Sequence, residues 1–324
     1  MTITLSQIRN FSQNESPVLI VGAPRSGTSL LYRILQKHSS FKLHGGDGDT
    51  AVNLVESNIF SKPYNLSEPN KLNYLLNNRQ IYDEFLASIQ GIQQYQNLIA
   101  AQFIFSKLYR KKKFDFFRKI TWKITLSDSL IASFFYYAKQ ARGVKRIVEK
   151  TPSEIYHLPE IKATFPHAKL LFIHRHPVDV FTSYKRRLET SKTLNLKPSE
   201  LRWLEIALER FCAEYESSIA LALKEQNANP DHFLLIAYED LVNQSEKTIE
   251  TVCQFLGEAY EVECLVQDER QKEQWQIDPH LFSEVQKVTK NWRDFIDETE
   301  AQWLENRLQD VMLQLGYSRY SKSI

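Results

Sequence analysis

A turn of small and hydroxyl-bearing residues follows the first apolar run of the chain and could bind an anion. The segment reads VGAPRSGTSLLYRIL, from Val21 to Leu35. Backbone N–H groups converge in such a turn, and the helix that starts after it adds the positive end of its dipole. An arginine adds a permanent charge with several N–H donors. The predicted ligands of the anion are Arg25, Ser26, Gly27, Thr28 and Ser29.

This loop differs from the loops that bind ATP or GTP. Those loops place a lysine directly before their Ser or Thr, and Gly27 stands there in this chain. No obvious carboxylate at a strand end is suited to hold the magnesium of a nucleoside triphosphate. A small-molecule kinase with a degenerate loop remains an alternative. A second alternative is a protein of the same fold that binds a nucleotide and catalyses no reaction.

A second group of cationic and hydroxyl residues occurs in LLFIHRHPVDVFTSYKRRLE, Leu170 to Glu189. Arg175 follows an apolar strand, and a proline in the next positions favours the start of a helix. Ser183 and Arg187 are four residues apart, so they share one face of that helix. Two guanidinium groups and a hydroxyl can surround a dianionic phosphate. We predict a second phosphate site, separate from the loop.

Both segments resemble nucleotide-binding motifs of the sulfotransferase superfamily, whose members use 3′-phosphoadenosine-5′-phosphosulfate (PAPS) as donor. APRSGTSLL is similar to the superfamily's 5′-phosphosulfate loop, which has PxSGT(S/T) where kinases have GKS/T. The spacing of Arg175, Ser183 and Arg187 is similar to its 3′-phosphate motif. The resemblance implies transfer of a sulfuryl group to a hydroxyl, or less favourably an amine, with PAP as the other product.

Two further segments resemble this superfamily. In FLLIAYEDL the family tyrosine, here Tyr238, lies close to the adenine, and an aromatic at the end of a strand can stack on a base. IVEKTP resembles the branch with tyrosylprotein and bacterial sulfotransferases, and Lys150 there could stabilise the sulfuryl oxygens. Lys150 and Arg25 are the predicted catalytic cations. A packing tyrosine and a surface ion pair are the alternative interpretations. At VTKNWRDF, Val288 to Phe295, and directly before it, the candidate contacts to the nucleotide are Lys287, Lys290 and Arg293.

Sulfuryl transfer needs a base for the proton of the acceptor. NLVESNIFSKP resembles the acidic stretch that supplies a glutamate in the tyrosylprotein and polyketide-associated branches, and it points to Glu56. His44, Asp47 and Asp49 are rivals, because the preceding LHGGDGDTA lengthens the connection. His174 and His176 flank the phosphate arginine, and we predict hydrogen-bonding roles for them. No spacing typical of a zinc site occurs, and the chemistry requires no metal.

The elements that must position these residues are short apolar strands alternating with helices. Strands are predicted at Val18–Val21, Arg146–Val148, Leu170–His174 and Phe233–Ala237. Apolar residues at helical spacing predict helices over about 30–35, 198–215, 249–256 and 303–315. Such strands indicate a parallel sheet buried on both faces. The predicted fold is α/β, a three-layer P-loop-type fold with a mostly parallel central sheet and a helical insertion at about 57–130.

Composition is that of an ordinary globular protein. The 324 residues are 43% hydrophobic and 25% charged, and the net charge of +2 gives no reason to expect nucleic acid or a membrane surface as partner. We predict one domain, 1–324, without a secretory signal or membrane span, located in the cytoplasm. Cys212, Cys253 and Cys264 are expected to be buried thiols. The acceptor is predicted only as a hydroxyl on a small molecule, carbohydrate, lipid or peptide.

Overall fold

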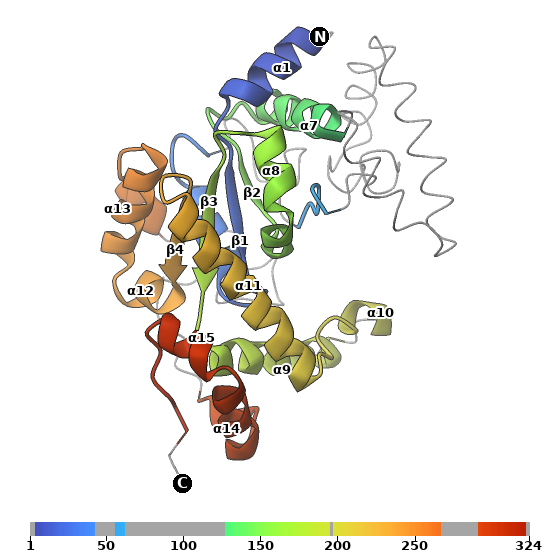
Figure 1. Cartoon of the computed structure of the whole chain (residues 1–324), viewed down its shortest axis with the longest axis vertical. Coiled ribbons are helices and arrows are strands. Elements are labelled where there is room, and N and C mark those ends of the chain that lie inside the picture. Colours follow the sequence, from blue (N-terminus) through green and yellow to red (C-terminus); the bar gives the residue numbers. More distant parts are fainter. Residues whose placement is uncertain (1–3, 43–55, 62–126, 195–196, 267–290, 322–324) are drawn as a thin grey trace. The chain divides into compact units, whose positions relative to one another are not determined.

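The structure is a computed structural model, which describes residues 4–42, 56–61, 127–194, 197–266 and 291–321 (Figure 1). The predicted insertion at 57–130 lies almost entirely outside these ranges, so it stays a prediction. Five candidate site residues also lie outside the described ranges and stay predictions: His44, Asp47, Asp49, Lys287 and Lys290.

Four strands form one sheet in the order β2–β1–β3–β4. The strands are β1 (Val18–Gly22), β2 (Val148–Lys150), β3 (Lys169–His174) and β4 (Phe233–Ala237). β3 and β4 run parallel, with Leu170 opposite Phe233 and His174 opposite Ala237. All of β1 is buried, as expected of a strand covered on both faces. The predicted α/β fold with a mostly parallel sheet flanked by helices is confirmed.

The second strand differs from its prediction. It begins at Val148, two residues later than expected, and it includes Glu149 and Lys150. Both polar side chains are buried, which is unusual for their types. A search for apolar runs therefore ended the strand too early.

The chain forms two compact units, Met1–Leu19 with His38–Lys169, and Ile20–Lys37 with Leu170–Ile324. In the first unit, α1 (Leu5–Asn14) packs on α7 (Ser127–Arg142), and α7 packs on α8 (Leu158–Thr164). A short 3₁₀ helix, η2 (Pro152–His157), connects β2 to α8. The aromatic rings of Phe11, Phe135 and Phe165 meet between these helices. This core supports β2 and the residues that follow it.

In the second unit, each segment that contains predicted nucleotide-binding residues leads from a strand into a helix. α2 (Thr28–Leu35) follows β1, α9 (Pro177–Thr193) follows β3, and α12 (Tyr238–Asn243) follows β4. The buried face of α2 contains the four predicted apolar residues, Leu30, Leu31, Ile34 and Leu35. Pro177 occupies the first turn of α9, as predicted. Parallel strands bring these helix starts to the same edge of the sheet.

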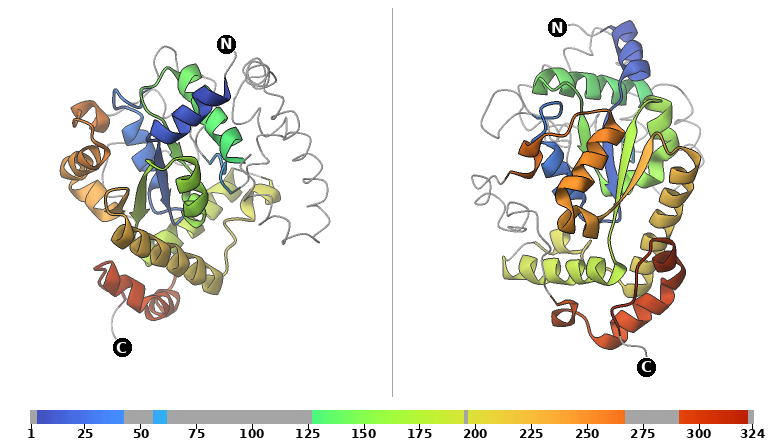
Figure 2. Two further views of the ribbon diagram at one scale, coloured as in Figure 1. Left: turned by 45° about the horizontal axis from the view of Figure 1, so that its top comes forward. Right: turned by 90° about the vertical axis from the view of Figure 1, so that its left-hand side faces the viewer.

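The remaining helices of the second unit surround these segments. They are α10 (Pro198–Leu201), α11 (Leu208–Ala228), α13 (Ser245–Leu256), η3 (Val262–Leu265), η6 (Trp292–Asp294), α14 (Glu298–Arg307) and α15 (Gln309–Gln314). α11 and α13 pack beside β4, and α14 packs against α9 and α11 (Figure 2). Gly257 ends α13 in the left-handed conformation, as predicted for its position.

Two helix predictions were wrong in extent. The helix expected from Pro198 to Tyr215 is divided into α10 and α11, and the one expected over 303–315 is divided into α14 and α15. Trp303, assigned to the apolar face, is 39% exposed. Apolar spacing continues across each break, so periodicity alone could not locate it.

The cysteine prediction is confirmed, since all three thiols are free and buried. Burial raises the pKa of Cys253 to about 11 and that of Cys264 to about 12. In the part of the chain that the structure describes, no helix has both the length and the apolar character needed to cross a membrane.

Candidate functional site

The loop after β1 has the geometry of an anion site. Gly27 precedes the first residue of α2 with a φ of 109°, a left-handed value that favours glycine. The backbone of Arg25 is also in the left-handed conformation, with a φ of 72°. Backbone strain of this kind at a non-glycine residue costs of order 1–3 kcal/mol and is concentrated at functional sites. The Ser26 hydroxyl is buried and has no hydrogen-bond partner among the described residues.

The second phosphate motif lies on β3 and α9. Arg175 follows the end of β3, and Ser183 and Arg187 lie one turn apart on α9. Ser183 is buried, with 4% of its surface exposed. The Nε atom of Arg25 donates a hydrogen bond to the Ser183 hydroxyl over 3.2 Å. The structure therefore brings the two predicted sites together within the second unit.

Tyr238 connects the loop to Arg175. A Cβ atom built on Gly27 would lie 2.5 Å from Cδ2 of Tyr238, so the loop backbone contacts the edge of this ring. The Arg175 guanidinium lies over the ring, with Cζ 4.3 Å from its centroid, in a cation–π arrangement. Gly27, Tyr238 and Arg175 thus form one contact series. The tyrosine was predicted beside an adenine, and its ring contacts both of the predicted phosphate-binding segments.

Arg175 is fixed by its surroundings. The Tyr215 hydroxyl donates to the Arg175 carbonyl over 2.7 Å. The Asp179 carboxylate lies 3.7 Å from Nη2 of the guanidinium. The Nε atom is buried and has no hydrogen-bond partner in the described ranges. An N–H donor in this condition is ready to bind an anion.

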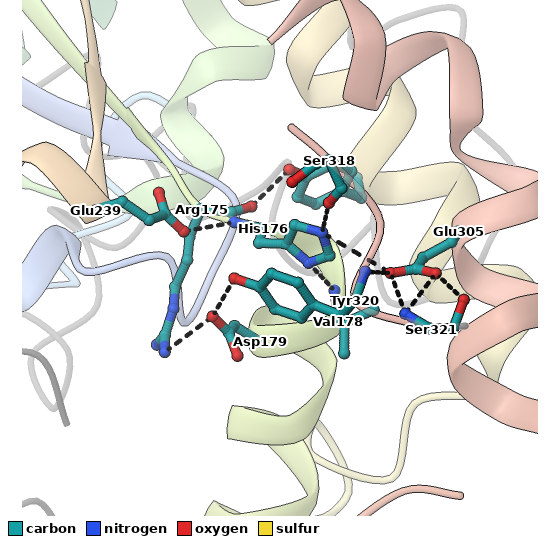
Figure 3. A network of polar contacts seen from close by, with 10 residues as sticks. Arg175, His176, Val178, Asp179, Glu239, Glu305, Ser318, Tyr320 and Ser321 are labelled. Atoms are coloured by element: carbon teal, nitrogen blue, oxygen red, sulfur yellow. Dashed lines mark hydrogen bonds and ion pairs between the residues drawn. The ribbon is translucent and has the colours of Figure 1, made fainter. Parts of the chain in front are cut away.

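His174 and His176 have the hydrogen-bonding roles predicted for them. Nδ1 of His174 and the Tyr317 hydroxyl are 2.8 Å apart. Nε2 of His176 lies 3.0 Å from the Ser318 carbonyl, and the Val178 N–H donates to Nδ1. Burial lowers the pKa of His174 to about 4 and also lowers that of His176. Both rings are therefore neutral near pH 7; Figure 3 shows the contacts of His176.

Glu56 and Lys150 form an ion pair in the first unit. The Lys150 ammonium, almost fully buried, donates to Oε1 of Glu56, whose side chain is half exposed. The Glu56 N–H donates to the Lys150 carbonyl over 2.7 Å. Glu56 has a φ of 55°, so its backbone is left-handed like that of Arg25. The pair combines a carboxylate open to solvent with a cation held inside the protein.

Two buried carboxyl groups that sequence reasoning missed hold the segment around Glu56. Oε1 of Glu149 accepts hydrogen bonds from the hydroxyls of Ser57, at 2.6 Å, and Thr151, at 2.5 Å. Burial raises the pKa of Glu149 to about 7. These bonds attach the segment after Glu56 to the end of β2.

The second of these carboxyl groups, that of Glu154, binds the same segment. Its Oε1 accepts from the N–H groups of Phe60 and Ser61, at 3.0 and 3.2 Å. Burial raises the pKa of Glu154 to about 8. The sequence signal was the Glu149-Lys150 pair, which resembled an ordinary surface ion pair, and a second acidic residue, Glu154, four positions after Lys150.

The remaining candidate, Arg293, lies on η6. Its guanidinium covers the ring of the buried Trp292, 4.1 Å from the centroid, and pairs with Glu298 at 3.1 Å. No group of three or more His, Cys, Asp or Glu side chains within the described ranges is arranged to hold a metal ion.

Comparisons with known proteins identify the family and the fold. A family model described as "Sulfotransferase family" matches residues 17–262. The sulfotransferase domain from the curacin biosynthetic pathway is 20% identical, with a TM-score of 0.53 over 95% of this chain and 100% of that one. Sulfotransferase STF9 from Mycobacterium avium is 13% identical, with a TM-score of 0.51 over 95% and 79% of the two chains.

A search of curated proteins gives no match. At these identities the two solved structures establish likeness of fold alone. The family match covers more than half of the chain and includes both segments that we predict to bind phosphate. The chain therefore belongs to the sulfotransferase family, and its predicted place in the PAPS-dependent superfamily is confirmed.

Proposed function

We propose that this protein transfers a sulfuryl group from PAPS to a hydroxyl group of an acceptor, and less favourably to an amine. The main support for the proposal is the hydrogen bond from Arg25 to Ser183. It joins a loop suited to a 5′-phosphosulfate and a helix suited to a 3′-phosphate in one cationic site. A donor with a single chain of phosphates, such as ATP, does not need two such groups.

The residues present fit the nucleotide. The buried Ser26 hydroxyl and the buried Nε of Arg175 are polar groups that gain a partner when an anion binds. We assign the 5′-phosphosulfate to Arg25–Ser29 and the 3′-phosphate to Arg175, Ser183 and Arg187. Tyr238, which contacts both segments, is assigned to the nucleotide as well.

The reaction forms a bond between the acceptor oxygen and sulfur and breaks the bond between sulfur and the phosphate oxygen of the donor. The acceptor proton goes to Glu56, and PAP leaves with the electron pair of the broken bond. The ion pair occupies Oε1 of Glu56, so we assign Oε2 to accept the proton. Lys150 orients this carboxylate and supplies positive charge for the oxygens of the transition state. The phosphosulfate bond of PAPS supplies the driving force.

The acceptor is proposed only by its chemistry, as a hydroxyl on a small molecule, carbohydrate, lipid or peptide. The region expected to select it, about 57–130, lies mainly outside the described residues. A cytoplasmic location and function without a metal stay our predictions from the sequence.

Binding of three nucleotides tests the proposal. Thermal shift and calorimetry should show that PAP stabilises the protein at lower concentration than AMP, because AMP lacks the 3′-phosphate. ATP with magnesium should stabilise it less than PAP. Selective stabilisation by ATP with magnesium would instead indicate a kinase. Radiolabelled PAPS offered to a panel of acceptor classes then tests turnover, and PAP binding without any turnover would indicate a non-catalytic protein.

A further inference from the structure

The segment Tyr317–Ser321 lies against the turn that carries Arg175 (Figure 3). It follows α15 and falls outside the residues matched by the family model. Its Ser318 carbonyl faces Nε2 of His176 at 3.0 Å. Because Nδ1 of this ring accepts from the Val178 N–H, Nε2 carries the proton and donates to Ser318. The residue next to Arg175 is thus bound by this segment.

Tyr320 makes the contact that extends toward the guanidinium. Its ring stacks on His176, with centroids 3.7 Å apart and planes inclined by 10°. Its hydroxyl lies 3.3 Å from Oδ2 of Asp179, to which it donates. The same Oδ2 lies 3.7 Å from Nη2 of Arg175. A series of contacts therefore runs from Tyr320 through Asp179 to the arginine.

Glu305 holds the end of the segment in place. This carboxylate, on α14, is fully buried. It accepts hydrogen bonds from the N–H of Tyr320, at 2.6 Å, and the N–H of Ser321, at 3.2 Å. The Ser321 hydroxyl donates to it as well. A buried carboxylate that accepts several hydrogen bonds holds its donors in place, because the loss of one donor would leave a buried oxygen without a partner, which costs free energy.

Tyr317 supports the backbone of the same turn. Its hydroxyl donates to Oε2 of Glu239 over 2.9 Å and, having given its proton there, accepts from Nδ1 of His174. Oε1 of Glu239 accepts from the His176 N–H over 3.0 Å. The residues on both sides of Arg175 are therefore fixed by the segment or by a carboxylate that it contacts.

From these contacts the geometry points to a role for the segment Tyr317–Ser321 in aligning the Arg175 guanidinium with the 3′-phosphate. Tyr320 acts through Asp179 and is a positioning residue. The inference rests on the proposed function, because it concerns the same nucleotide site. It assigns to residues outside the family match a part in the affinity for the 3′-phosphate.

The test compares PAP with AMP in Tyr320→Phe, which keeps the ring on His176 and removes only the hydroxyl. Loss of one hydrogen bond predicts a dissociation constant for PAP about two- to tenfold higher. The affinity for AMP should stay unchanged, because AMP has no 3′-phosphate. Glu305→Gln should act in the same direction. Tyr260→Phe, outside these contacts, is the control and should bind both ligands as the wild type does.

A double-mutant cycle separates alignment from general loosening of the fold. In an Arg175→Ala background, Tyr320→Phe should have no further effect on PAP affinity. Equal loss of PAP and AMP affinity, additive effects in the cycle, or no effect of Tyr320→Phe would each overturn the inference. If the wild type itself binds PAP no better than AMP, the proposed function is overturned and the inference with it.

Discussion

Arg25 and Ser183, separated by 158 residues in the chain, are joined by a hydrogen bond of 3.2 Å from the guanidinium Nε to the hydroxyl. One belongs to the loop before α2 and the other to the buried face of α9. A nucleotide with phosphates at both ends of its ribose would use the two segments together.

Ser183→Ala should weaken PAP binding. It removes the acceptor that holds Arg25 and a hydroxyl assigned to the 3′-phosphate, so a dissociation constant about fivefold higher is expected. Isothermal titration calorimetry measures it. Ser191→Ala is the matched control, because Ser191 is also buried on α9 and its hydroxyl has no partner among the described residues. Equal affinities in the two variants would contradict the assignment of Ser183.

Gly27→Ala should destabilise the protein and abolish tight PAP binding. The new Cβ would lie 2.5 Å from the Tyr238 ring at a φ of 109°, and strain with overpacking predicts a loss of about 2–4 kcal/mol. Urea denaturation measures the free energy of unfolding. Gly257→Ala meets no atom within 4 Å, so it should lose only about 1–2 kcal/mol through its backbone conformation. Equal losses would show that Tyr238 does not constrain the loop.

Glu56→Gln should reduce kcat about 10²- to 10⁴-fold, because the amide cannot accept the acceptor proton. The affinity for PAP should be unchanged. Steady-state assays with labelled PAPS and an identified acceptor measure the rate. Glu15→Gln removes another lysine-paired glutamate of the first unit, at 2.6 Å from Lys139, and should leave the rate unchanged. A Glu56→Gln enzyme with full activity would exclude Glu56 as the base.

Glu149 should make stability fall as pH rises from about 4.5 to 7. Burial raises its pKa from 4.5 to about 7, so in this interval the folded state binds more protons than the unfolded state. The free energy of unfolding then decreases with pH, by on the order of 1.4 kcal/mol for each unit of pKa difference. His174, with a lowered pKa, acts in the opposite direction between about 4 and 6.5.

The contribution of Glu149 is therefore measured as a difference. Denaturation of wild type and Glu149→Gln at several pH values should show the advantage of the wild type shrinking from pH 4.5 to 7. His174 contributes equally to both proteins and cancels. Glu154 does not cancel fully, because the charge of Glu149 helps to raise its pKa, and this repulsion, present only in the wild type, shrinks the advantage further. A difference independent of pH would mean that Glu149 titrates in the folded state as it does in the unfolded one.

The parts of the site that lie within one strand–helix unit could be predicted from sequence. The loop before α2 and the start of α9 are such parts, since a short segment contains both the strand end and the helix start. Tyr238 was placed at the correct strand end, but its contacts with Gly27 and Arg175 depend on three separate segments. No local pattern contains that information.

The missed residues act over long distances in the chain. Glu305 and Tyr320 meet His176 and Asp179 across more than a hundred positions, and neither stands in a recognisable motif. Glu149 and Glu154 were visible beside Lys150, yet a charged side chain is normally exposed, so their burial could not be expected. Whether such a side chain is buried, and which distant residue it contacts, depends on how segments far apart in the chain pack together.

The ring of Tyr238 has a consequence for selection between isomers. The rigid, flat side chain contacts Gly27 at its edge and Arg175 on its face, and so sets the spacing between the two segments proposed to bind the phosphates. This spacing would favour a ligand whose two phosphates are separated by a matching distance. If the two segments bind the two phosphates as proposed, an adenosine bisphosphate with its second phosphate on the neighbouring ribose carbon, 2′ instead of 3′, should bind more weakly than PAP.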